Sequence, residues 1–98
     1  MSKAEVLYPD GYSGREEESE MKGWLGVKVR LASGELFALT FYDPTRLGQE
    51  IDTSVSAGNP YFAEPGMVVV DAVTPASVQR AVDALVEDHY FESLKAER

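Results

Sequence analysis

The sequence has no cysteine, one histidine and one tryptophan among its 98 residues. The lack of cysteine excludes disulfide bonds, thiolate zinc sites and cysteine nucleophiles. The sequence also has no apolar run near the roughly 20 residues that a membrane-spanning helix needs, and its first residues lack the apolar stretch of a secretory signal. We therefore expect a cytoplasmic protein that has no membrane partner.

Basic residues are scarce as well. Nine lysines and arginines stand against 17 aspartates and glutamates, which gives a formal net charge of −8 at pH 7. Nucleic acids and anionic membranes are bound mainly through Lys and Arg, so we expect no nucleic acid partner. The acidity serves either general solubility or a face for a basic protein partner, and both alternatives stay open.

Motifs of enzyme and nucleotide sites are missing too. The sequence contains neither of the glycine-rich phosphate loops GxGxxG and GxxxxGK[ST], and no nucleophile elbow surrounds its serines. The single histidine, His89, falls at the end of a predicted helix, where packing or the helix dipole explains it. The carboxylates show no spacing typical of a metal site or an acid–base pair. We expect no metal, no cofactor and a non-enzymatic function.

Residues 24–42 predict a β-hairpin around which the rest of the chain is organised. Apolar residues alternate with other residues in both halves, with the period of two that a half-buried strand shows. Residues 32–34, Ala-Ser-Gly, provide a turn between the halves. Asp43-Pro44 then ends the second half of the hairpin.

The length of the turn decides which side chains share a face. A two-residue loop would divide the apolar residues between two faces. A three-residue loop over 32–34, with Gly34 in the left-handed conformation, pairs Val29 with Phe37 and gathers the large apolar side chains on one face. We choose this register because a slip of one residue would expose half of them. The gathered residues are Leu25, Val27, Val29, Phe37, Leu39 and Phe41.

Two pairs, Asp43-Pro44 and Thr74-Pro75, each combine a helix-capping side chain with a proline suited to the first helical position. They predict helices over 44–52 and 75–88. Both helices have apolar residues at the spacing of one helix face. The residues expected in the core are Leu47 and Ile51 from the first helix, and Val78, Ala81, Val82 and Leu85 from the second.

The other segments are less regular. Residues 4–8 predict a short edge strand, and residues 67–73 a strand within the sheet. Residues 12–22 carry an acidic run without apolar periodicity and predict a mobile surface loop. Residues 95–98 predict a frayed tail. In the loop 53–66, two aromatic residues either pack on the core or form an exposed anchor; they are Tyr61 and Phe62.

The expected order is therefore (β)ββαβα, in a single domain over residues 1–98. The fold class is α+β: a two-layer sandwich with a three- to four-stranded mixed sheet and two helices on one face. The sequence leaves open whether residues 4–8 join the sheet. It also leaves open which half of the hairpin pairs with residues 67–73.

If the helices cover one face of the sheet, the other face of the hairpin exposes aromatic, aliphatic and basic side chains together. Tyr, Trp and Arg commonly anchor protein interfaces, so this face is the main candidate site. We expect a homodimer through it; the competing explanation is that residues 4–8 or 12–22 fold over the face. The candidate interface residues are Trp24, Lys28, Arg30, Leu36, Ala38, Thr40 and Tyr42.

The acidic run gives an alternative function. Glu16, Glu17, Glu18 and Glu20 form a candidate binding arm for a basic protein. The predicted element order and the acidity resemble those of small bacterial immunity proteins that neutralise a cationic toxin. This resemblance lies at the level of the fold and implies an inhibitor or immunity-type binder.

A third alternative is a small ligand-binding module or enzyme. Tyr42, Asp43 and Arg46 form the densest polar cluster at a strand-to-helix junction, where open α/β sheets often bind ligands. His89 would complete this candidate ligand site if the fold brought it beside Arg46. Otherwise Asp43 caps a helix, Arg46 is solvated and Tyr42 packs on Trp24. The sequence identifies neither a specific partner nor a ligand.

Overall fold

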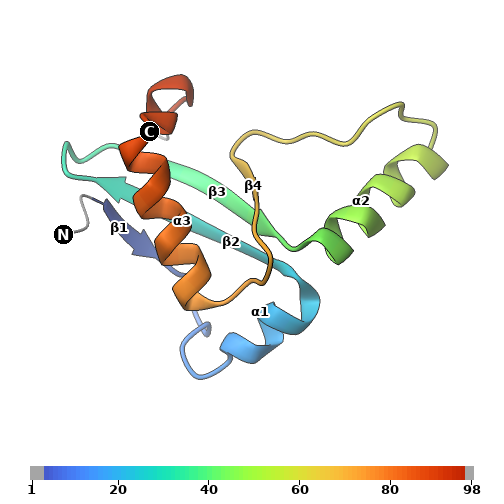
Figure 1. The fold of residues 1–98 in the computed structure, drawn as a ribbon, viewed down its shortest axis with the longest axis horizontal. Helices are drawn as coiled ribbons and strands as arrows, with labels where there is room; N and C mark the ends of the chain where they lie inside the picture. The colour runs from blue at the N-terminus through green and yellow to red at the C-terminus, as the bar shows by residue number, and fades with distance from the viewer. Residues whose placement is uncertain (1–3, 97–98) are drawn as a thin grey trace.

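The structure is a computed structural model that describes residues 4–96 (Figure 1). The predicted α+β class is confirmed, and the mixed sheet has four strands. One helix, α1, was not expected. The elements are β1 (Ala4–Leu7), α1 (Glu16–Lys22), β2 (Trp24–Leu31), β3 (Leu36–Tyr42), α2 (Pro44–Ser56), β4 (Met67–Val69), α3 (Pro75–Glu87) and the 3₁₀ helix η1 (Tyr90–Ser93).

The strands lie in the order β1-β2-β3-β4. The first two pairs are antiparallel, and β3 and β4 are parallel. Both questions that the sequence left open are thereby answered. The N-terminal segment joins the sheet as an edge strand, and the second half of the hairpin is the neighbour of β4.

The hairpin has the predicted register. Val29 pairs with Phe37, and Val27 pairs with Leu39. The turn closes with a hydrogen bond from the Gly34 amide to the Leu31 carbonyl, and Gly34 adopts the left-handed conformation that the three-residue loop requires, with φ of 93°. All six gathered apolar side chains are at most 4% exposed.

Helix α3 and the segment after it cover this core face of the sheet (Figure 1). Thr74 caps α3 by accepting a hydrogen bond from the Ser77 amide, at 3.2 Å. Val78 and Val82 are fully buried against the strands. Phe91 of η1 packs on Phe37, with 5.1 Å between ring centroids. The helix ends one residue earlier than predicted, and Ala96 in the expected frayed tail is partly buried on the core.

Helix α2 departs from the prediction. Asp43 caps it as expected, but the helix continues to Ser56 and projects past the sheet (Figure 1). The predicted placement of Leu47 and Ile51 in the core is wrong, because all residues of α2 stay at least partly exposed and Ile51 is 41% exposed. The radius of gyration is accordingly 13.9 Å, whereas a compact chain of this length has a radius of gyration of about 12.6 Å. The spacing of apolar residues predicts that a helix has an apolar side, but it does not identify the surface that buries this side.

The predicted loop over 12–22 is also corrected, because it contains helix α1. Three glutamates in its first turn and Lys22 in its last turn complement the helix dipole, which compensates for the missing apolar periodicity. Gly23 ends the helix in the left-handed conformation. Before α1, Tyr12 is buried and stacks on Tyr8, with 4.5 Å between ring centroids. The mobility of this segment stays a prediction.

The contrast between the core and α2 can be tested with two truncations. Leu39→Ala should lower the free energy of unfolding by about 2–5 kcal/mol, because Leu39 is 1% exposed. Ile51→Ala should change it by at most about 0.5 kcal/mol in dilute solution. Urea unfolding followed by the fluorescence of Trp24 measures both. Equal losses would mean that α2 belongs to the core.

Candidate functional site

The face of the sheet opposite α3 is called the open face here. Strand pairing places alternate residues of all four strands on it, including every predicted interface residue. Within residues 4–96 no helix packs on this face. Its residues are Glu5 and Leu7 of β1; Trp24, Gly26, Lys28 and Arg30 of β2; Leu36, Ala38, Thr40 and Tyr42 of β3; and Met67 and Val69 of β4.

A shallow, mainly apolar hollow of about 320 Å³ lies at the centre of the open face. Gly26 contributes to it because the space where a side chain would stand is empty to 4 Å. Ala38, with its small side chain, also lines the hollow and lies opposite Lys28 across the hairpin. The lining residues are Leu7, Tyr8, Pro9, Gly26, Val27, Lys28, Ala38, Leu39 and Thr40.

The rim of the hollow is basic, in contrast to the rest of the chain. Arg30 pairs with Glu5 on the neighbouring strand, with 3.5 Å between Nη1 and Oε1. Both side chains are more than half exposed, so the ion pair contributes about 1 kcal/mol at most. Lys28 is exposed beside them. The strands therefore present two cations and one carboxylate on this face of a protein with a net charge of −8.

The end of the open face at Tyr42 is closed. Tyr42 lies opposite Trp24 as predicted, but it is 3% exposed and unavailable as an interface residue. Phe62 meets the Tyr42 ring edge-on, with 5.9 Å between centroids. The Tyr42 hydroxyl donates a 2.6 Å hydrogen bond to Oε1 of Glu64. Of the two aromatic residues in the connection to β4, Phe62 packs down while Tyr61 is 68% exposed.

Burial and then the Glu64 carboxylate raise the pKa of the Tyr42 hydroxyl to about 12. Both disfavour the phenolate, because it loses its hydration and faces a negative charge. The hydroxyl is therefore a hydrogen-bond donor over the whole physiological pH range. The Tyr42–Glu64 bond holds the connection after α2 against the sheet.

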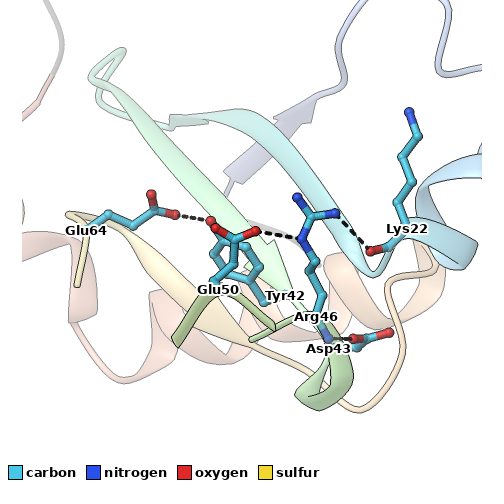
Figure 2. A network of polar contacts seen from close by, with 6 residues as sticks. All are labelled: Lys22, Tyr42, Asp43, Arg46, Glu50 and Glu64. Carbon is cyan, nitrogen blue, oxygen red and sulfur yellow. Dashed lines mark hydrogen bonds and ion pairs between the residues drawn. The ribbon is translucent and has the colours of Figure 1, made fainter. Parts of the chain in front are cut away.

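The candidate ligand site around Asp43 is occupied by its own contacts (Figure 2). The Asp43 carboxylate accepts a 2.7 Å hydrogen bond from the Arg46 amide. The Arg46 side chain donates to Glu50 at 2.8 Å and to the Lys22 carbonyl at 3.4 Å. These contacts join the first turn of α2 to the end of α1, which gives the polar groups a structural role.

The structure does not bring His89 to this cluster. His89 follows α3 with a positive φ of 58°, and its exposed imidazole contacts Glu92 at 2.8 Å. Nearby Phe91 packs at Phe37, near the beginning of β3, whereas Arg46 follows the end of that strand. Among the described residues, moreover, no group of three or more His, Asp or Glu side chains is arranged to hold a metal ion.

The glutamates of the candidate binding arm lie on α1. Glu17, Glu18 and Glu20 are exposed, and Glu16 is half-buried. Arg15 lies 3.9 Å from Glu18, and both side chains are well exposed. The run is thus presented by a short helix whose residues are not buried.

One feature of α2 was missed by the sequence analysis. Its apolar residues Leu47, Ile51 and Val55 form a stripe that lacks a burying partner among the described residues, and Val55 is 56% exposed. The polar residues of α2 face the protein instead. Arg46 pairs with Glu50 and donates to the Lys22 carbonyl, and Ser54 donates to the Tyr61 carbonyl at 2.7 Å. The amphipathic spacing was visible in the sequence, but nothing in it showed that the polar side would face inward.

Comparisons with protein-family models, curated proteins and solved structures found no match to this chain. Among residues 4–96, every helix is too short or too polar to cross a lipid bilayer.

The hydrogen bond of Tyr42 leads to a pH-dependent prediction. Tyr42→Phe should cost about 1–2 kcal/mol of unfolding free energy at neutral pH. Because folding raises the pKa of Tyr42 from about 10 to about 12, its contribution is complete below pH 10 and is lost as the pH rises through 12. The difference between wild type and variant should shrink accordingly in urea unfolding between pH 8 and pH 12.

Burial also raises the pKa values of Tyr8 and Tyr12. Their contributions cancel when the unfolding free energy of Tyr42→Phe is subtracted from that of the wild type. The matched control is Tyr61→Phe, which alters an exposed side chain and should leave the unfolding free energy nearly unchanged. A difference for Tyr42→Phe that is independent of pH would contradict the role given to its hydroxyl.

Proposed function

We propose that this chain is a non-enzymatic interaction domain that self-associates through the open face of its sheet. The observation that carries the proposal is the apolar hollow over β1, β2 and β3, beside which Trp24 is 40% exposed. An aromatic side chain next to an apolar, desolvated depression is the usual arrangement of an interface hot spot. A cytoplasmic location stays a prediction from the sequence.

Two further observations support association. Val69 at the β4 edge is 45% exposed, which adds an apolar side chain to the open face beyond the covered Tyr42. Around the hollow the protein's excess negative charge is also absent, since Lys28 and Arg30 outnumber Glu5 there. Two copies can therefore approach there with less repulsion than elsewhere on their acidic surfaces.

Ala38→Glu tests the proposal at the centre of the hollow. The new carboxylate lies opposite Lys28 across the hairpin, so the fold should tolerate it. In a dimer it would be desolvated, and the dissociation constant should rise about tenfold or more. Native mass spectrometry and light scattering over a concentration series measure the change.

The matched control is Ala84→Glu, which adds the same charge at an exposed position of α3 and should leave association unchanged. Dimerisation that persists in Ala38→Glu would exclude the open face as the interface. A wild-type protein that stays monomeric at all concentrations would overturn self-association itself.

A second candidate function is the binding of a basic protein through α1. The exposure of its glutamates, and of Met21 at 87%, favours this alternative. Reversing Glu16, Glu17 and Glu18 to lysine should then abolish capture of the basic partner, and salt should weaken the wild-type complex steeply. Self-association through the open face should instead persist in this triple lysine variant, because α1 lies outside that face. The variant therefore distinguishes the two functions.

A further inference from the structure

The connection from β3 through α2 to β4 joins two parallel neighbouring strands. Such a crossover normally lays its helix on one face of the sheet, where the helix buries its apolar side. Here the crossover helix projects away from the sheet (Figure 1). Among residues 4–96, the open face of the sheet thus has no covering helix, and the apolar side of α2 has no sheet to pack on.

The contacts of the connection identify the face to which α2 belongs. After α2, Phe62 and Glu64 contact Tyr42, whose side chain lies on the open face. The opposite face is already covered by α3. The crossover therefore passes on the side of the open face.

The first turn of α2 is held where it cannot reach its own hollow. Asp43 follows Tyr42 without a linker, and its amide donates to the Gly23 carbonyl at 2.9 Å. Arg46 adds its contact with the Lys22 carbonyl (Figure 2). From these anchors the 13-residue helix extends about 20 Å outward.

Deepening the self-association proposed above, on which this inference rests, we propose that α2 of one copy packs its Leu47, Ile51 and Val55 stripe on the open face of a second copy. In the same way, α2 of the second copy packs on the open face of the first copy. The dimer is then two-fold symmetric, with each crossover helix exchanged between chains. Each α2 then packs on an apolar sheet face, which it does not reach within its own chain.

Charge favours the second copy as the occupant. The segment from α2 to β4, residues 44–66, carries one arginine, two glutamates and one aspartate. It would meet the open face where Lys28 and Arg30 lie. Glu50 is paired with Arg46 and Glu64 accepts from the Tyr42 hydroxyl, so Asp52 is the carboxylate of this segment that can complement the basic rim.

Cross-linking tests the exchange, since the natural chain has no cysteine. Ala38→Cys and Ile51→Cys are made in separate chains, mixed at equal amounts and treated with a short bismaleimide. Val55→Cys provides a second arm position, and Ala84→Cys replaces Ala38→Cys as the control for the face. Native mass spectrometry reports dimerisation, and denaturing mass spectrometry identifies which chains are joined.

Exchange predicts that the product joining Ala38→Cys to Ile51→Cys or Val55→Cys predominates, and that it is lost with Ala84→Cys. A dimer that joins mainly two Ala38→Cys chains would overturn the exchange but keep the open face as an interface. A cross-link within one chain carrying both substitutions would show that α2 folds onto its own sheet, which also overturns exchange. A monomer without cross-links would overturn both the exchange and self-association.

Discussion

The register of the β2–β3 hairpin is the constraint on which the rest of the structure depends. It places six large apolar side chains on one face, and burying them requires a cover. Helix α3 and Phe91 provide this cover. Because the apolar content of the strands is concentrated on that face, the chain folds with one helical layer, and the other face is left with small, basic and aromatic side chains.

The direction of α2 follows from a junction rather than from packing. Gly23 ends α1 and lies against Asp43, where an added Cβ would collide with the carboxylate. This close approach, together with the Arg46 contacts, sets the helix beyond the end of the sheet. Local hydrogen bonds thus determine the path of α2, while its apolar stripe takes no part in the fold of a single chain.

Local patterns predicted the hairpin, its register, the two capped helices and the position of the open face, because alternation and capping act over a few residues. They failed where the outcome depends on distant partners. Leu47 and Ile51 have core spacing, yet Leu47 is only half-buried and Ile51 is exposed. Tyr42 looked like an interface residue, but Phe62 and Glu64, twenty and more residues away, cover it. Helix α1 was missed because it is formed by dipole and capping effects without an apolar face.

The shortness of β4 has a consequence for how the molecule opens. The strand pairs over three residues and closes the long connection 43–66, so few contacts repay the entropy of closing that loop. Its hydrogen bonds with β3 should therefore be among the first to exchange with solvent, while the hairpin and α3 stay folded. If α2, its connection and β4 detach together, the proposed exchange of α2 between two copies does not require global unfolding.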